Sequence, residues 1–281
     1  MIIKNEDRTG PRSSGSDDVP ASIKEMMNPM DFVAPTEFVE LPSLGQGYPE
    51  SHPLHDQETI EIKFMTAKEE DILTSRSLLK KGIAIDRLIQ SLVKSPNIDA
   101  SSILVGDRNA ILIKARASAY GPKYKTTINC PNCGDQSKRA FDLENPSVYS
   151  GDDWEDYDIE KTESGTFIVT LPYSKMKVEC CLLTGKQETQ ILKQSQDKKQ
   201  QNSLVTNQMK TFIVSVNGLT EAPVINYFIN NVIAPDSRYL RNAMKVITPN
   251  IRIVHDYRCS SCDYEEELEV PFGADFFWPD R

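Results

Sequence analysis

Alternation of apolar and polar residues near residue 60 turns into a helical spacing within one short stretch. In IEIKFMTAKEEDIL, residues 60–73, the alternation that is typical of a strand runs as far as Thr66. Glu69 follows three residues later, and a threonine with a glutamate at this distance forms a capping box at the start of a helix. The stretch therefore predicts a strand, a helix cap and a helix in succession.

The same succession occurs a second time further along the chain. In KVECCLLTGKQETQIL, residues 177–192, an alternating strand pattern reaches Thr184, and Gln187 follows three residues later. The frame Thr-x-Lys-x-Glu is present in both stretches, with an offset of 184 − 66 = 118 residues. A pattern that recurs in this way indicates an internal repeat.

Two longer helical patterns support the repeat. VGDRNAILIKARA, from Val105, and APDSRYLRNAMKV, from Ala234, each place apolar residues at helical spacing after an aspartate. We expect these aspartates, Asp107 and Asp236, to cap the helices. Each pattern ends at a proline turn and continues into an extended stretch with a cysteine pair. The aspartate and the first cysteine are 23 residues apart in both cases (130 − 107 and 259 − 236).

Both cysteine pairs have the spacing Cys-x-x-Cys and lie in the predicted turns of hairpins. They are Cys130 and Cys133 in INCPNCGD, and Cys259 and Cys262 in RCSSCDYEEELEV. A knuckle of this spacing directs two thiolates at one metal, which is half of the ligand set of a structural zinc ion. We therefore predict one zinc ion bound by all four cysteines, with no open position for catalysis.

These patterns predict an α+β fold of two pseudo-repeated halves, each with a strand, helices and a Cys-x-x-Cys hairpin, joined at a split zinc ribbon. The tail is rich in Gly, Ser, Asp and Pro, and we expect disorder to about Pro35. The expected divisions are a flexible tail at 1–40, an extended lead-in at 41–57, a first half at 58–143, an acidic linker at 144–165, and a second half with an aromatic C-terminus at 166–281.

Composition narrows the function classes. The chain has 281 residues, of which 26% are charged and 39% hydrophobic, as in an ordinary globular protein. The net charge of −9 argues against a nucleic-acid surface, which needs clustered Lys and Arg. No apolar run approaches the roughly 20 residues that span a bilayer, and the N-terminus has no secretion pattern. We therefore expect six cysteines without disulfides, in a reducing cytosol.

Alternatives remain for the cysteines. A Cys-x-x-Cys redox protein would place Cys130 and Cys133 at the start of a helix, and a zinc-ribbon module could contact nucleic acid or a polymerase. Cys180 and Cys181 are adjacent on a predicted strand, so we expect one to be a core thiol and the other to be partly exposed. His255 is expected on the surface of a hairpin. We find no catalytic motif and no phosphate-binding loop, and expect no enzyme.

Several motifs together resemble the baseplate hub family of T-even-type contractile-tailed bacteriophages. They are ELPSLGQGYPESHPL, IEIKFMTAKEEDILTSRSLLKKGIAIDRLI, VGDRNAILIKARASAYGPKY, CPNCG, LLTGKQE and VPFGADFFWP. The resemblance covers most of residues 40–279, and it departs in the polar N-terminus and in an insertion at 195–208. It implies a structural protein in virion assembly: a hub subunit or hub assembly factor in the host bacterial cytoplasm and in the tail baseplate. Its implied partners are other hub or tail proteins, and it implies no small-molecule substrate.

The C-terminal stretch ADFFWPDR places three aromatic residues in a row, Phe276, Phe277 and Trp278. No helix or strand can bury all three on one face. We expect this stretch either to close the core beside the second hairpin or to anchor a partner.

Overall fold

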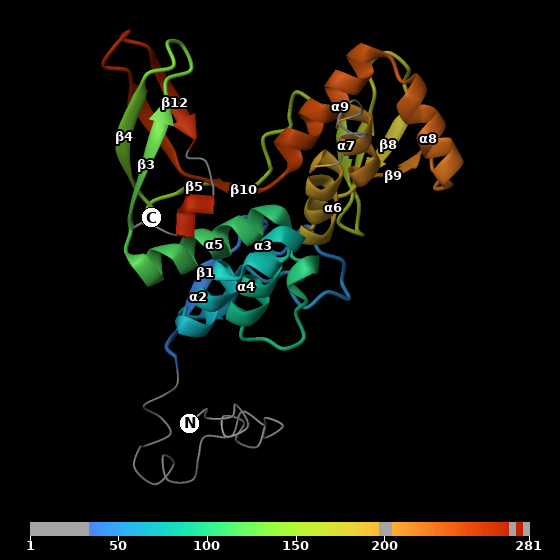
Figure 1. Ribbon diagram of the computed structural model, residues 1–281. Helices are drawn as coiled ribbons and strands as arrows, with labels where there is room; N and C mark the ends of the chain where they lie inside the picture. Colours follow the sequence, from blue (N-terminus) through green and yellow to red (C-terminus); the bar gives the residue numbers. More distant parts are fainter. Residues whose placement is uncertain (1–33, 197–203, 270–273, 278–281) are drawn as a thin grey trace, which may run out of the picture. The chain divides into compact units, whose positions relative to one another are not determined.

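Helices and short antiparallel strands alternate along the chain, which confirms the predicted α+β class (Figure 1). The structure is a computed structural model and describes residues 34–196, 204–269 and 274–277. The predicted disorder of the tail falls almost wholly on residues 1–33, which lie outside these ranges. From Thr36 onward, the described buried apolar side chains form one continuous core. No helix within the described ranges has the length and apolar character needed to cross a membrane.

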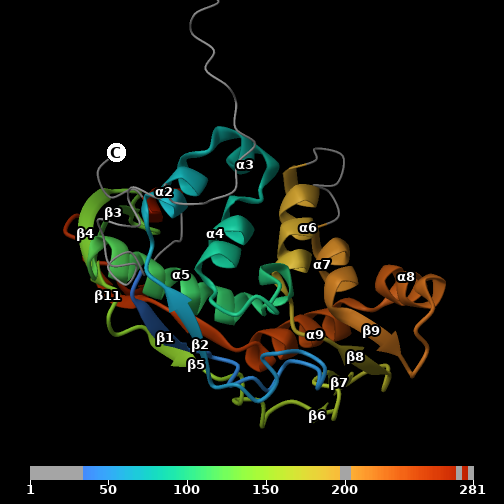
Figure 2. The ribbon, with the colours of Figure 1, turned by 90° about the horizontal axis from the view of Figure 1, so that it is seen from below.

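The first half of the fold, residues 36–143, ends in a hairpin. Its elements are β1 (Thr36–Glu40), β2 (Thr59–Lys63), α2 (Ala67–Thr74), α3 (Arg76–Lys81), α4 (Ala84–Leu92), the 3-10 helix η3 (Ala100–Ser102), α5 (Val105–Tyr120), β3 (Lys123–Asn129) and β4 (Gln136–Asp142). β1 and β2 form a two-stranded antiparallel sheet, and β3 and β4 form the hairpin. β1 packs beside α5, as Figure 2 shows.

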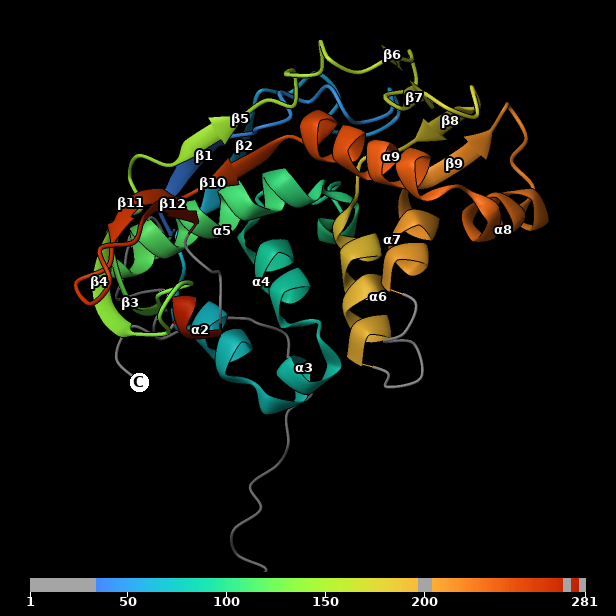
Figure 3. The same cartoon turned by 90° about the horizontal axis from the view of Figure 1, so that it is seen from above.

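The second half, residues 166–269, also begins with a pair of strands and a helix and ends with a long helix and a hairpin. Its elements are β7 (Phe167–Thr170), β8 (Lys177–Cys180), α6 (Gly185–Gln196), α7 (Leu204–Phe212), β9 (Ile213–Val216), α8 (Ala222–Asn231), α9 (Ala234–Ile247), β10 (Asn250–Arg252), β11 (Val254–Arg258) and β12 (Glu265–Glu269). β7 and β8 pair as β1 and β2 do, within a four-stranded sheet of order β6-β7-β8-β9. In Figure 3, α5 and α9 lie end to end, with α4 beside α5 and α7 beside α9.

In each half, a further residue pairs with the second strand, β2 or β8. In the first half, Val93 forms an isolated antiparallel bridge with Ile62 of β2. In the second half, Ile213 at the start of β9 pairs with Cys180 of β8. Ile62 and Cys180 are 180 − 62 = 118 residues apart, the same offset as the two helix caps. The repeat therefore extends to strand pairing, although only the second half forms a full third strand.

The structure confirms both helix caps at the starts of α2 and α6. Glu69 Oε2 accepts hydrogen bonds from the backbone N–H and the hydroxyl of Thr66, at 2.9 and 2.6 Å. Gln187 Oε1 accepts the same two bonds from Thr184, at 2.8 and 3.0 Å. The Glu69 side chain is fully buried, and Lys63 Nζ lies 2.8 Å from its Oε1. The two caps therefore share a geometry but differ in charge.

The prediction that Asp107 caps its own helix is wrong. Asp107 is the third residue of α5, and its fully buried carboxylate accepts hydrogen bonds from the loop between β1 and β2. The donors are the backbone N–H of Ser43 at 3.0 Å, the Ser43 hydroxyl at 2.6 Å and the Tyr48 hydroxyl at 2.7 Å. The carboxylate therefore satisfies buried loop donors, 59 and more residues away in the sequence.

Asp236 has the same role in α9, so its predicted capping is also wrong. It accepts hydrogen bonds from the backbone N–H groups of Tyr173 and Ser174, at 3.0 and 2.9 Å, in the loop between β7 and β8. The two loops begin alike, because a Leu-Pro pair directly follows both β1 and β7. Leu41 and Leu171 of these pairs are both buried. An aspartate on a long helix thus fixes a Leu-Pro loop in each half.

The two halves contact each other near the starts of α5 and α6. Leu104 and Thr184 form an antiparallel bridge that joins the segments before these helices. The guanidinium of the buried Arg108 lies 2.6 Å from a carboxylate oxygen of Asp86 and 3.7 Å from one of Glu188. A cation from the first half is therefore shared between carboxylates of both halves.

Segment 144–165, predicted as an acidic linker, contains two strands. β5 (Ser147–Tyr149) pairs antiparallel with β10, and β6 (Ile159–Lys161) pairs with β7. Residues 36–40, predicted as part of the tail, form β1. Strands form here because each has an antiparallel partner: β5 pairs with the distant β10, whereas β6 pairs with the adjacent β7 and β1 with the next strand, β2. The other expected divisions of the chain stay predictions.

Two of the C-terminal aromatic side chains close the core. Both phenylalanines of the 3-10 helix η5 (Ala274–Phe277) are buried. The ring of Phe276 meets Tyr124 of β3 edge to face, with centroids 5.1 Å apart, and its carbonyl accepts a 2.7 Å hydrogen bond from Arg116 Nε. Neither phenylalanine is exposed for docking. Trp278 lies outside the described residues.

Candidate metal centre

The four cysteines of the two Cys-x-x-Cys pairs lie in the turns of hairpins that are side by side (Figures 1 and 3). Cys130 directly follows β3, and Cys259 directly follows β11. In each turn, the N–H of this first cysteine donates to the carbonyl five residues later, Asp135 at 2.8 Å or Tyr264 at 2.9 Å. The residue before that carbonyl, glycine in one turn and aspartate in the other, has a positive φ of 75° or 53°. The two turns therefore have the same backbone pattern.

The sulfur atoms of the two turns come together. Cys130 Sγ lies 3.7 Å from Cys262 Sγ, and Cys133 Sγ lies 3.6 Å from Cys259 Sγ. All four sulfur atoms lie within 4.8 Å of one another. In a tetrahedral tetrathiolate site with metal–sulfur bonds of about 2.3 Å, sulfur atoms are about 3.8 Å apart. The cluster can therefore hold one metal ion.

Hydrogen-bond donors lie beside two of the sulfur atoms. The backbone N–H of Ser261 lies 3.4 Å from Cys259 Sγ, and the side-chain amide of Asn132 lies 3.5 Å from Cys262 Sγ. The hydrogen bond from Ser261 is the main cause that lowers the pKa of Cys259 to about 6, from its ordinary value of 9.0. At Cys133 the backbone N–H of Asp135 lowers the pKa, but the neighbouring cysteines and burial outweigh it and raise the pKa to about 12. Thiolates rather than thiols bind metal ions, so the environment of Cys259 suits a metal ligand.

Contacts outside the cluster also join the hairpins. Arg139 Nη2 donates to the carbonyl of Arg258 at 2.8 Å, and its guanidinium lies 5.5 Å from the centre of the Tyr257 ring. The Ser261 hydroxyl donates to Asp135 Oδ2 at 2.7 Å. No local sequence pattern predicts these contacts, because none shows which side chains of one hairpin face the other.

The remaining cysteines lie elsewhere. Cys180 is fully buried in β8, whereas Cys181 is half-buried and accepts a 3.6 Å hydrogen bond from the side-chain amide of Gln187. This is the expected division into a core thiol and a partly exposed one. Burial raises the pKa of both thiols, which keeps them protonated. The side chain of His255 lies outside the described residues.

Residues 34–278 match a protein family described as T4 bacteriophage base plate protein. A search of curated proteins and a search of solved structures each found no match. The matched range contains both halves, all four clustered cysteines and the insertion at 195–208, and it leaves out the first 33 residues. The match confirms the baseplate part of the resemblance seen in the sequence. The chain belongs to the family of T4 bacteriophage base plate proteins.

Proposed function

We propose that this chain is a subunit or assembly factor of the central baseplate hub and acts by binding other hub or tail proteins, without catalysis. Its place is the host cytoplasm during assembly and the tail baseplate of the virion. The baseplate family, the acidic net charge and the cysteine cluster, which would offer a metal no open position for substrate, support this proposal.

We further propose that the four cysteines hold one structural Zn²⁺. The observation that carries this proposal is the meeting of two Cys-x-x-Cys turns, with sulfur separations of 3.6 and 3.7 Å across the turns. Four thiolates in tetrahedral arrangement are the preferred ligands of structural zinc. The ion would fasten the last hairpin of one half to the last hairpin of the other, and so keep a binding surface in one shape.

The structure gives less support to a redox role. In dithiol oxidoreductases, the Cys-x-x-Cys pair lies at the N-terminus of a helix, which lowers the thiol pKa. Here both pairs lie in turns between strands, and the sulfur contacts of 3.6 and 3.7 Å join cysteines of different pairs. Protein purified without chelator should contain one zinc per chain. Two zinc ions per chain, or metal content unchanged in Cys259→Ser, would contradict a shared site.

The hub proposal is tested by affinity purification of the tagged chain from infected cells. We expect other baseplate hub proteins to be retained at moderate salt, identified by mass spectrometry. Binding to DNA that weakens steeply with salt, without any hub protein, would instead support the nucleic-acid alternative.

A further inference from the structure

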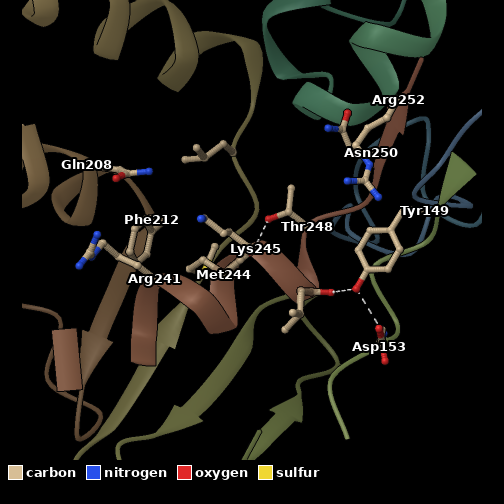
Figure 4. Close-up of a pocket in the computed structure, with 12 residues that line it drawn as sticks. Tyr149, Asp153, Gln208, Phe212, Arg241, Met244, Lys245, Thr248, Asn250 and Arg252 are labelled. Carbon is tan, nitrogen blue, oxygen red and sulfur yellow. Dashed lines mark hydrogen bonds between the residues drawn. The ribbon is translucent and has the colours of Figure 1, made fainter. Parts of the chain in front are cut away.

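A cavity opens between α9, α7 and the segment that leads into β10 (Figure 4). Its volume is about 680 Å³, enough for a few side chains of a bound peptide. Its lining residues are Tyr149, Asp153, Leu183, Gln208, Phe212, Arg241, Met244, Lys245, Val246, Thr248, Asn250 and Arg252.

Positive charge predominates in this cavity although the chain as a whole is acidic. Arg241, Lys245 and Arg252 line it, and Asp153 is the only acidic residue among the described lining residues. No ion pair joins any of the three cations to a described acidic residue. Arg241 and Lys245 are four residues apart on α9, where like charges destabilise a helix. The cavity therefore presents cations that form no ion pair with any described carboxylate.

Apolar side chains lie among these cations. Phe212 of α7 and Met244 of α9 are mostly buried and form part of the lining, as does the half-buried Leu183. Figure 4 shows Arg241, Gln208 and Phe212 on one side of the cavity, and Arg252 and Tyr149 on the other. A matching occupant needs an apolar side chain for the lining and acidic groups for its rim.

The equivalent place in the first half is already filled. The offset of 129 residues that relates Asp107 to Asp236 also relates Arg116 of α5 to Lys245 of α9. Arg116 is completely buried and donates to the carbonyl of Phe276, whose ring packs against Tyr124. Lys245, in contrast, is exposed. A short aromatic turn therefore covers the cation in the first half, and no described residue covers it in the second.

We propose that the cavity binds a short segment of a partner baseplate protein that carries an aromatic side chain beside acidic residues. The aromatic ring packs against Phe212 and Met244, and the carboxylates pair with Arg241 and Lys245. The segment thus occupies the place that Phe276 takes in the first half. This inference rests on the proposed function, because it names the kind of partner segment that the chain holds.

Site-specific photo-crosslinking tests the proposal on the full chain. Gln208, exposed at the edge of the cavity, is replaced by the photoreactive p-benzoylphenylalanine, and Ser77, exposed on α3, is replaced in a control. Tagged protein is isolated from infected cells, irradiated and digested, and the crosslinked peptides are sequenced by mass spectrometry. We expect the cavity position alone to crosslink a baseplate protein, at a segment with an aromatic residue and at least one nearby Asp or Glu. Crosslinks to DNA, to a basic segment or to a second copy of this chain would overturn the proposal.

Charge reversal gives an independent readout. Arg241→Glu with Lys245→Glu should lower recovery of the crosslinked partner about tenfold or more, since like charges then face each other. The control reverses two exposed cations of the first half, Lys68→Glu with Arg76→Glu, and should keep recovery unchanged. Equal recovery with both variants would overturn the cavity proposal and leave the hub proposal standing. If the unaltered chain retains no baseplate protein, the hub proposal itself fails.

Discussion

The two halves of this protein share a scaffold but differ in how it is completed. In the first half, Arg116 on the long helix is buried under the aromatic turn at the C-terminus, whereas the equivalent Lys245 of the second half lies exposed in a cavity. Asp107 and Asp236 each accept hydrogen bonds from the loop between the first two strands of their half, although the donors differ. Two halves with the same scaffold can therefore share this kind of internal hydrogen bond, while only the second half leaves the equivalent cation of its long helix exposed.

Among the variants considered, the substitution of one clustered cysteine should disturb the contact between the two hairpins most. Structural zinc binds to zinc-finger peptides with roughly 10–16 kcal/mol, so Cys259→Ser should cause the largest loss of stability among these variants. Because the site spans both hairpins, amide exchange should rise in β3–β4 as well as in β11–β12. The control Cys181→Ser, outside the cluster, should keep both the metal and the slow exchange. Faster exchange in β11–β12 alone would contradict a staple between the halves.

Removing the aspartate of each long helix compares the two loop contacts. Asp107→Ala leaves three donors from Ser43 and Tyr48 without an acceptor and should lower the free energy of unfolding by about 3–5 kcal/mol. Asp236→Ala leaves two backbone donors and should lower it by about 2–3 kcal/mol. Urea unfolding at pH 7 measures both. Equal losses would show that the hydroxyl donors add little.

A close approach between the halves can be tested at Gly106, near the start of α5. A Cβ atom at this position would lie 2.1 Å from the carbonyl oxygen of Pro249, which belongs to the second half. Gly106→Ala should therefore force the backbones apart and lower stability by about 1–3 kcal/mol. At Gly82, a Cβ would meet no atom within 4 Å, but φ is +67°. Gly82→Ala should therefore cost only about 1 kcal/mol, from backbone strain.

A small effect is also expected from exchanging the two helix caps. Glu69→Gln gives the first cap the chemistry of the second and should lower stability at pH 7 by about 1–2 kcal/mol. Burial of Glu69 raises its pKa, but hydrogen bonds from Lys63, Ser91 and Thr66 outweigh burial and lower the pKa to about 2, from 4.5. The unfolded chain therefore binds the proton more readily than the folded chain.

That difference in the pKa of Glu69 fixes the sign of the pH dependence. The stabilisation by ionised Glu69 is fully present above pH 4.5 and is lost as the pH falls towards 2. The gap between the unaltered chain and Glu69→Gln, measured by urea unfolding, should narrow over this range. The reverse exchange, Gln187→Glu, serves as the control for the second cap. A gap that stays constant from pH 6 to pH 3 would contradict the assignment to Glu69.

The predictions that the structure confirms rest on sequence patterns that extend over only a few residues. The spacing of Thr66 and Glu69, the repeated hairpins and the Cys-x-x-Cys turns are local, and the structure contains each of them. Cys130 and Cys259 each lie 23 residues after the aspartate of a long helix. Equal lengths of chain therefore lead from equivalent helices to equivalent turns, and the two cysteines lie in one cluster.

The role of Asp107 and the burial of Phe276 depend on long-range contacts, which the sequence does not show. An aspartate near a helix start is a common cap, so the sequence predicts this role for Asp107, but its partners lie in a loop 59 and 64 residues away. The burial of Phe276 depends on Arg116, 160 residues earlier in the chain. No local pattern distinguishes an aromatic residue that closes a core from one that docks a partner.

Cys133 and Cys259 are 126 positions apart in the sequence, and this separation also sets the order in which the two cysteine pairs are synthesised. At synthesis rates of about 5–20 residues per second, roughly 6–25 s pass between the appearance of the first cysteine pair and that of the second. During this interval the chain contains only the first of the two cysteine pairs that form the cluster. A chain that stops before Cys262 lacks one of the four clustered cysteines, so the proposed four-sulfur metal site forms only in chains that extend past this residue.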